Sequence, residues 1–259
     1  MIQEYLVRHI ESINDARDYL DGWIHVSNLY DPCAREIGIR RRLKIKPQQK
    51  IAVSDRLLWE SGTAYHNTLR GYLAKMGMLL GHWSCRRCDW ASSEVLPHAC
   101  PRSCNRCGKQ DFRYREVTMR DEKRKIIGNG DCWISESRKL VPTEIKSMGI
   151  SGFTNMRAVL AKHAFQVMMY REMAANLGWP VANYGIVLCA PLGFSMSPFK
   201  EYRVERDQEA INRAYARAEE IRGSARGVLP DRICSSILEP RAKACIVAKD
   251  CFNGLRKAK

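Results

Sequence analysis

The sequence predicts an α/β fold, in which a central β-sheet is flanked by helices. Residues 126–148 contain two apolar, β-branched stretches joined by a polar turn at 136–139, which is typical of a β-hairpin. Residues 183–190, NYGIVLCA, form a nearly continuous apolar run and favour a buried central strand. Helical patterns at 59–76 and 155–177 precede and follow the hairpin. Helices that alternate with strands in this way indicate an α/β architecture, and 259 residues suffice for one domain with an insertion.

The composition is that of a soluble globular protein, with 45% hydrophobic and 27% charged residues. The formal net charge of +15 favours a polyanionic partner such as DNA. The sequence has no run of eighteen apolar residues, and its first fifteen residues do not resemble a signal peptide, so we expect a cytoplasmic protein without a membrane partner. Cysteines of a cytoplasmic protein are expected to be reduced. The clusters among the eleven cysteines therefore indicate metal sites.

The hairpin carries the first candidate site. Glu144 and Lys146 are two positions apart in the expected second strand, 140–146, so both side chains turn to the same face and Ile145 points into the core. Asp131 lies in the expected first strand and can approach that face when the two strands pair. Two carboxylates and one ammonium group would then converge, an arrangement that can hold a hard divalent cation through oxygen ligands.

Two helices beside the hairpin contribute further candidates. His66 lies at the edge of the apolar stripe of the helix 59–76, where a histidine is either a surface residue or a neutral imidazole able to bind Mn²⁺. Gln166 and Tyr170 are four residues apart on the helix 155–177, which Gly178 ends, and His163 shares their face. The stripe that should pack the first helix into the core consists of Tyr65, Leu69, Tyr72 and Leu73.

A zinc ribbon is predicted between the first helix and the hairpin. Two Cys-x-x-Cys pairs stand fifteen residues apart, and two such knuckles close one tetrahedral thiolate site. Cys100 and His98 remain alternative ligands. Arginines and lysines around the ribbon suit contact with phosphates. The predicted zinc ligands are Cys85, Cys88, Cys104 and Cys107.

The two ends of the chain are rich in basic residues and cysteines. An amphipathic helix is expected at 1–22, and Ser27 can cap a short helix that is followed by Cys33 and a basic helix through Arg42. A further strand is expected at 202–204, a helix at 206–222 and a linker at 223–230. The last segment has three cysteines within eighteen residues, which form an incomplete metal site by themselves. These are Cys234, Cys245 and Cys251.

The order of these motifs resembles that of the PD-(D/E)XK nuclease superfamily, and within it the RecB-like nucleases and the CRISPR-associated iron-sulfur exonucleases. Gly-Thr-x-x-His, then an acid, Glu-x-Lys and Gln-x-x-x-Tyr follow one another as they do in that group. The resemblance implies a restriction-endonuclease-like core with a central mixed sheet flanked by helices. It implies catalytic roles for Asp131, Glu144 and Lys146, with Gln166 and Tyr170 in support. Mg²⁺ or Mn²⁺ would then be bound by His66, Asp131, Glu144 and the backbone carbonyl of Ile145.

The same resemblance implies a [4Fe–4S] cluster that joins the two ends of the chain. In the iron-sulfur nucleases one N-terminal cysteine pairs with three near the C-terminus, which implies Cys33 together with Cys234, Cys245 and Cys251. The sequence departs from that family because ten residues, and not two, separate Cys234 from Cys245. Zinc at the same four thiolates therefore remains an alternative, and either group would stabilise the fold.

The expected organisation has four parts, and the expected activity is that of an exonuclease. The parts are an N-terminal helical region 1–58, a nuclease core 59–81 and 117–222, a zinc-ribbon insertion 82–116 and a cysteine-rich clasp 223–259. We expect Mg²⁺- or Mn²⁺-dependent hydrolysis of DNA, with single strands or DNA ends as substrates and helicase or recombination proteins as partners. Alternatives are a non-catalytic zinc-ribbon DNA-binding subunit of a recombination or replication complex, and a zinc-stabilised protein-interaction or transcription factor.

Overall fold

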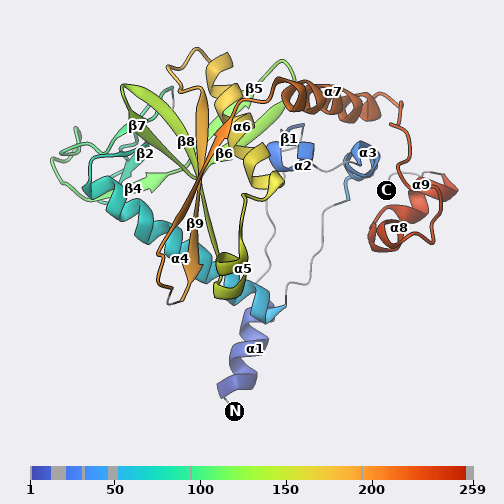
Figure 1. Cartoon of the computed structure of the whole chain (residues 1–259), viewed down its shortest axis with the longest axis horizontal. Helices are drawn as coiled ribbons and strands as arrows, with labels where there is room; N and C mark the ends of the chain where they lie inside the picture. The colour runs from blue at the N-terminus through green and yellow to red at the C-terminus, as the bar shows by residue number, and fades with distance from the viewer. Residues whose placement is uncertain are drawn as a thin grey trace. The chain divides into compact units, whose positions relative to one another are not determined.

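A computed structural model of the chain describes residues 2–12, 22–30, 33–45, 52–93, 95–193 and 195–254 (Figure 1). The chain divides into two compact units. The first unit comprises Met1–Asp15, Ile51–Arg120 and Gly128–Asp207, and the second comprises Ala16–Lys50, Asp121–Ile127 and Gln208–Lys259. Residues 13–21 of the helix expected at 1–22 lie outside the described residues. The four-part organisation expected from the sequence stays a prediction.

The first unit is built on a seven-stranded mixed sheet with the strand order β10-β9-β8-β7-β2-β3, in which β4 pairs with β2. Strands β8 and β9 are parallel, and the other neighbours are antiparallel. The mixed α/β architecture predicted from the sequence is therefore confirmed. The strands are β2 (Leu79–Cys85), β3 (His98–Ala99), β4 (Phe112–Arg115), β7 (Cys132–Glu136), β8 (Lys139–Gly149), β9 (Tyr184–Leu192) and β10 (Lys200–Glu205).

The predicted hairpin is formed by β7 and β8. Ser137 and Arg138 have φ angles of 48° and 65°, the left-handed conformation that a two-residue hairpin turn requires. Strand β8 is longer than expected, because its pairing with β9 continues as far as Gly149. Asp131 does not lie in a strand as expected. It occupies a bend between β6 (Ile126–Gly130) and β7, which frees its side chain from the strand alternation.

Helices cover both faces of this sheet (Figure 1). Leu69 of α4 (Val53–Lys75) packs in one cluster with Ile145 of β8. Val167 of α6 (Ala161–Asn176) packs with Val187, which is the register partner of Glu144. Successive residues of a strand point to opposite faces, so α4 covers the Ile145 face and α6 the Glu144 face.

Two helix predictions need correction. Tyr72 was expected in the core stripe of α4 but is 58% exposed, because the face of α4 against the sheet is narrower than the predicted stripe. The helix expected at 155–177 begins only at Ala161, as α6, and a break separates it from the short helix α5 (Ile150–Asn155), which was not expected. Lys200 explains the break, since its Nζ donates to the carbonyl oxygens at the end of α5, at 2.6 Å from Phe153 and 2.9 Å from Met156. Gly178, with φ of 77°, follows the end of α6 as predicted.

The second unit is mainly helical. Helix α3 (Ala34–Arg42) packs on α7 (Gln208–Ala225), and a Cβ atom at Gly38 would stand 2.1 Å from Ser224 Oγ, so only glycine permits this approach. Ser27 lies inside a helix and caps none. The cap of α3 is Cys33, whose Sγ accepts a hydrogen bond from the backbone N–H of Glu36. The remaining elements of the unit are β1 (Ile24–His25), α2 (Val26–Tyr30), α8 (Pro240–Ala244) and α9 (Ala248–Asn253).

Three elements complete the description. Helix α1 (Ile2–Ser12) packs on α4 in the first unit. Strands β5 (Val117–Asp121) and β6 form a three-stranded sheet with β1 in the order β1-β6-β5. Within the part of the chain that the structure describes, no helix combines the length and the apolar character needed to cross a bilayer.

Candidate active site and metal centres

Strand β8 brings the predicted Glu-x-Lys pair together on one face of the sheet. Lys146 Nζ lies 2.6 Å from Glu144 Oε1, and only 4% of the Glu144 side chain is exposed. The other oxygen, Glu144 Oε2, is buried and has no hydrogen-bond partner among the described residues. A buried carboxylate oxygen without a partner is costly unless a proton or a cation satisfies it. The local structure therefore favours a cation at this oxygen.

Asp131 joins this pair through the bend before β7. Its Oδ2 accepts a hydrogen bond of 3.0 Å from the backbone N–H of Ile145, between Glu144 and Lys146. The same oxygen lies 3.9 Å from Nδ1 of His66 on α4. The Asp131 carboxylate is thus fixed between the backbone of β8 and the helix α4.

Two charged residues that the sequence analysis missed complete the cluster. Arg70 places its Nη2 2.8 Å from Glu116 Oε1 and 3.5 Å from Asp131 Oδ1. Arg70 follows His66 by four residues on α4, and this helical spacing was the available signal for it. Glu116 stands alone between β4 and β5, and no motif marks it. We call the three carboxylates of Glu116, Asp131 and Glu144 the acid group.

The charges of the acid group shift the pKa values of its members. Burial, followed by the Asp131 carboxylate, raises the pKa of Glu144 to about 7, although Lys146 opposes the shift. Burial and Asp131 also raise the pKa of Glu116, against the influence of Arg70. Burial by itself would lower the pKa of Lys146, but the carboxylates of Glu144 and Asp131 outweigh it, and the net shift is upward. Lys146 therefore stays a cation, while Glu144 takes up a proton easily when no other cation is near.

The imidazoles around the acid group are held neutral. Burial lowers the pKa of His66, with Arg70 and Lys146 acting in the same direction and Asp131 opposing them. Burial and then Lys146 lower the pKa of His163 to about 4. A neutral imidazole has a free nitrogen lone pair, which a ligand of a metal ion requires.

The predicted helix residues lie beside the acid group as well. His163 Nδ1 is 3.4 Å from Gln166 Oε1 on α6, and both are partly buried. Tyr170 is buried, and burial and then Glu144 raise the pKa of its hydroxyl group well above the ordinary value. Tyr170 therefore faces the carboxylates as a neutral hydrogen-bond donor.

The ligand atoms of the acid group are of the kinds that bind a hard cation, but they stand too far apart to coordinate one together. Carboxylate oxygens with one imidazole are the ligands that Mg²⁺ or Mn²⁺ accept. Among the described residues, no three ligand atoms of this cluster lie within 4.8 Å of one another. Binding would thus require the side chains to rotate inward, and the partnerless Glu144 Oε2 is the oxygen that gains most from it.

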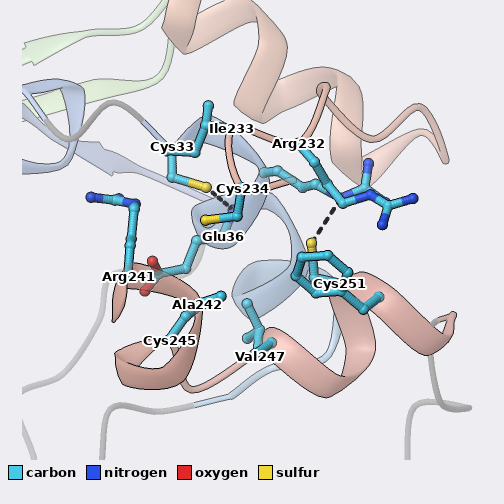
Figure 2. Close-up of a pocket in the computed structure, with 13 residues that line it drawn as sticks. Cys33, Glu36, Arg232, Ile233, Cys234, Arg241, Ala242, Cys245, Val247 and Cys251 are labelled. Carbon is cyan, nitrogen blue, oxygen red and sulfur yellow. Dashed lines mark hydrogen bonds between the residues drawn. The ribbon is translucent and has the colours of Figure 1, made fainter. Parts of the chain in front are cut away.

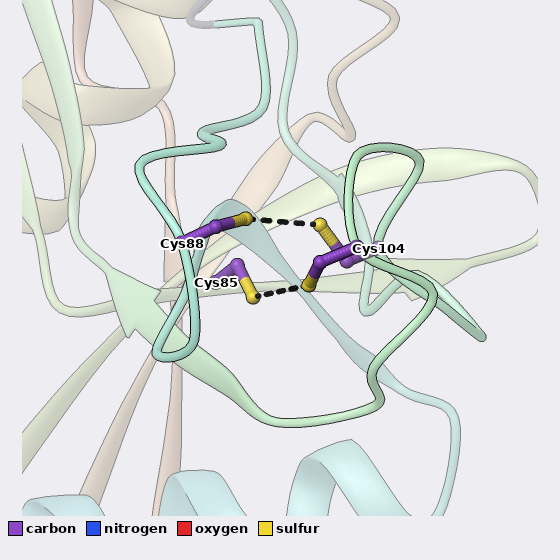
Figure 3. Close-up of side chains that lie close together, drawn as sticks. Cys85, Cys88 and Cys104 are labelled. Carbon is purple, nitrogen blue, oxygen red and sulfur yellow. Dashed lines mark hydrogen bonds between the residues drawn. The ribbon is translucent and has the colours of Figure 1, made fainter.

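The cysteines of the predicted zinc ribbon are closed into one group, which we call the ribbon group (Figure 3). Cys85 Sγ and Cys107 Sγ are 3.6 Å apart, and Cys88 Sγ and Cys104 Sγ are also 3.6 Å apart. Four thiolates at about 2.3 Å from one zinc ion would stand about 3.8 Å apart, so the group has the size of a single-ion site. Cys100 is exposed and lies outside the group. The four ligand atoms all lie within 4.8 Å of one another and can hold a metal ion.

The basic residues of the ribbon are less available for phosphate contact than their number indicates. Arg87 Nε lies 3.1 Å from Asp111 Oδ2, and Arg86 lies 3.6 Å from the other oxygen of the same carboxylate. Arg106 is paired with Asp89 at 2.5 Å. These ion pairs occupy part of the positive surface that the sequence analysis assigned to DNA.

The terminal cysteines, which are Cys33, Cys234, Cys245 and Cys251, surround one cavity of the second unit (Figure 2). Hydrogen bonds reach their sulfur atoms, among them those from the N–H of Glu36 to Cys33 at 3.4 Å and from Arg35 Nε to Cys251 at 3.2 Å. Among the described residues, no three of these sulfur atoms lie within 4.8 Å of one another, in contrast with the ribbon group. The cavity lining also includes Arg232 and Arg241.

Comparisons with known proteins leave the family of the chain open. No protein-family model matches the sequence, and no curated protein matches it. Similar solved structures include one described as SSO0001, with 17% identity, coverage of 99% of this chain and 98% of that chain, and a TM-score of 0.49. An alkaline exonuclease from Laribacter hongkongensis matches with 9% identity, 80% and 89% coverage and a TM-score of 0.45. Its complex with dAMP gives 12% identity, the same coverage and a TM-score of 0.43.

Proposed function

We propose that the chain is a metal-dependent deoxyribonuclease that hydrolyses phosphodiester bonds at the acid group. The observation that carries the proposal is the meeting of Asp131, Glu144 and Lys146 on β8 and the adjoining bend, where one buried carboxylate oxygen has no hydrogen-bond partner among the described residues. A carboxylate with one oxygen still available can bind a divalent cation, and an ammonium group beside it can contact a phosphate at the same time.

Each residue of the site has a distinct proposed task. Asp131, Glu144, the imidazole of His66 and the backbone carbonyl of Ile145 would hold Mg²⁺ or Mn²⁺. The ion, when bound, supplies Lewis-acid activation of the attacking water and neutralisation of phosphate charge. Lys146 keeps its proton, because its pKa is raised, and stabilises the negative charge that builds on the phosphate oxygens in the transition state.

The helix α6 is proposed to guide the substrate. Gln166 Oε1 accepts a hydrogen bond from Nδ1–H of His163, which fixes its amide group at the border of the site. Tyr170 would offer the substrate a hydroxyl group that stays protonated, because its pKa is raised, and that can donate a hydrogen bond. We propose single-stranded DNA or DNA ends as the substrate and exonuclease action as the mode, on the resemblance to the iron-sulfur exonucleases and on the net charge of +15.

Two further metal groups are proposed to stabilise the chain without taking part in hydrolysis. The ribbon group would bind one zinc ion, because its four sulfur atoms all lie within 4.8 Å of one another, with two pairs at 3.6 Å. The terminal cysteines would bind a [4Fe–4S] cluster, because they surround a cavity at larger separations and because Arg35 donates to one sulfur. Arginines in the cavity lining would offset the negative charge of a thiolate-bound cluster.

A cleavage assay tests the function directly. The purified protein is incubated with Mg²⁺ or Mn²⁺ and with linear single-stranded, linear duplex and circular DNA that carries a label at either end. Metal-dependent release of nucleotides from linear DNA, abolished by Asp131→Asn, is the expected result. Binding of DNA without cleavage of any substrate under either metal would instead favour the non-catalytic DNA-binding subunit.

A further inference from the structure

We propose that Arg70 acts as a built-in cation that limits the acid group to one divalent metal ion. The inference rests on the proposed function, because it concerns the number of ions that the same site can hold. Arg70 is here a positioning residue and not a catalytic one.

The two carboxylate oxygens of Asp131 have different neighbours. Oδ2 faces the backbone N–H of Ile145 and the imidazole of His66. Oδ1 faces Arg70, whose Nη2 is 3.5 Å away. One oxygen of Asp131 is thus on the side of the proposed ion, and the other is already engaged by a positive group of the protein.

Glu116 contacts the same guanidinium group. Its Oε1 lies 2.8 Å from the same Nη2 atom that approaches Asp131. Two carboxylates that converge on one point are the usual beginning of a second divalent-ion site, with the two ions about 4 Å apart. In this protein the point between Glu116 and Asp131 is occupied by guanidinium nitrogen.

Arg70 is held in place. Only 10% of its side chain is exposed, its Nη1 lies 3.5 Å from Asn67 Oδ1, and its guanidinium stands over the ring of Tyr114 at 5.2 Å. A guanidinium group fixed by an aromatic face and by acceptors does not leave its site freely. Arg70 therefore remains between the two carboxylates when a divalent ion approaches from the other side.

The charge of the cluster acts in the same direction. Three carboxylates face two fixed cations, Arg70 and Lys146, and both cations have raised pKa values. One divalent ion exceeds the remaining negative charge, and a second would be repelled by the first ion and by both side chains. Removal of the Arg70 charge frees Glu116 and Asp131 Oδ1 as ligands and also removes the part of the repulsion that comes from the guanidinium group.

The test is the stoichiometry of Mn²⁺ binding, measured by the loss of the free-ion paramagnetic resonance signal during titration. The variant Asp131→Asn/Glu144→Gln gives the background from all other sites, and the protein is used with its zinc and iron content as purified. We expect one Mn²⁺ above background for the wild type and for Arg70→Lys, and two for Arg70→Met. The double variant Arg70→Met/Glu116→Gln should return to one ion.

A second variant keeps the proposal testable when Arg70→Met does not fold. Glu116→Gln in the wild-type background should keep one ion and weaken its binding by about tenfold at most, which is the size expected for a lost neighbouring charge, because Arg70 and not the ion engages that carboxylate. Binding reduced to the background level of Asp131→Asn/Glu144→Gln would mean that Glu116 is a direct ligand, and it overturns the proposal. Two ions in the wild type, or one ion in a folded Arg70→Met variant, also overturn it.

Failure of the proposed function gives a different result. A protein that cleaves DNA with two bound ions refutes only the role of Arg70. A protein that binds no Mn²⁺ above the Asp131→Asn/Glu144→Gln background refutes the active site, and the role of Arg70 with it.

Discussion

The ribbon group and the acid group both gather possible metal ligands in the first unit, but they do so in opposite ways. The four sulfur atoms of the ribbon group lie within 4.8 Å of one another, with two pairs at 3.6 Å. The carboxylates of the acid group are separated, and each is paired with a cation of the protein, Lys146 with Glu144 and Arg70 with Glu116 and Asp131. One group is complete before an ion arrives, and the other is partly neutralised by its own side chains.

The difference explains how one chain can use metals for stability and for chemistry. A closed thiolate set binds its ion tightly and couples it to folding, because few other partners are available to the sulfur atoms. Carboxylates that already have ammonium and guanidinium partners gain less from a metal ion, so the ion can exchange and leave open positions for water and phosphate. The arrangement therefore predicts a permanent ion at the ribbon and an exchangeable one at the acid group.

The largest effect expected is the loss of cleavage in Lys146→Ala. On the proposed function, removal of the ammonium group takes away transition-state stabilisation at the phosphate. The rate of DNA cleavage should then fall by roughly 10³-fold, while the dissociation constant for DNA changes by about threefold or less. The exposed Lys139 on the same strand supplies the control Lys139→Ala, which should cleave normally. Unchanged cleavage in Lys146→Ala would move the chemistry away from the acid group.

The second effect is the selective loss of zinc or iron when a cysteine of one set is replaced. Cys104→Ser should remove zinc and leave iron, and Cys245→Ser should remove iron and leave zinc, because the two cysteine sets differ in spacing. Elemental analysis of anaerobically purified protein measures both, and absorbance near about 400 nm reports the cluster. Cys100→Ser is the matched control, since Cys100 is exposed and outside the ribbon group. Zinc lost from both variants, without iron in either, would mean two single-ion sites.

The sequence predicted the ribbon group more completely than the acid group. Two Cys-x-x-Cys pairs point to the four ligands directly, because each knuckle is a local structure, although Cys100 and His98 were open alternatives until the structure brought the four sulfur atoms together. The Glu-x-Lys pair was equally local, since strand alternation alone brings Glu144 and Lys146 to one face. The hairpin and the buried strand after it followed from patterns of the same short range, whereas the mixed sheet was implied by the resemblance.

What the sequence analysis missed depends on contacts between distant segments. Glu116 reaches the site only because β4 pairs with β2 and delivers the following residue to Arg70, and no local pattern encodes this. Asp131 was placed in a strand, whereas a bend turns its carboxylate to the Ile145 N–H. The break between α5 and α6 arises from Lys200, more than forty residues further along the chain.

The third effect is a pH dependence of the free energy of unfolding. It is expected from the acid group without a bound ion, because Glu144 is buried there. Burial and Asp131 raise the pKa of Glu144 to about 7 from an ordinary value near 4.5, so the folded state without a metal binds this proton more tightly than the unfolded chain does. The stabilisation from that proton is present below the unfolded value and is lost as the pH rises through about 7. Glu144→Gln imitates the protonated form at every pH. The variant should therefore be more stable than the wild type at pH 8, by on the order of 3 kcal/mol, and equal to it near pH 4.

Urea unfolding at pH 5 and pH 8, without added divalent ions, measures this difference. The exposed Glu136 of the same hairpin provides the control Glu136→Gln, for which the difference from the wild type should not change with pH. Added Mn²⁺ should reverse the order at pH 8, because it stabilises only the protein with an ionised Glu144. A Glu144→Gln variant less stable than the wild type at pH 8 in the absence of ions would show that the ion pair with Lys146 outweighs the cost of burial.

The smallest effect expected is a shift of the cluster's reduction potential when Arg35 is replaced. The guanidinium group of Arg35 contacts the sulfur of Cys251, much as that of Arg70 contacts the carboxylate of Asp131. Arg35 Nε lies 3.2 Å from Cys251 Sγ and its Nη1 donates to the carbonyl of Pro230 at 2.7 Å, so the guanidinium is fixed against the cavity. Arg35→Gln removes the positive charge from a thiolate ligand, and the reduction potential of a cluster there should become more negative by roughly tens of millivolts. Loss of absorbance near about 400 nm in air should also accelerate by about twofold to fivefold. Arg42→Gln, on the exposed side of the same helix, should change neither quantity. An unchanged potential in Arg35→Gln would mean that Cys251 is not a cluster ligand, and the terminal cysteines would then have to be regarded as a three-thiolate site.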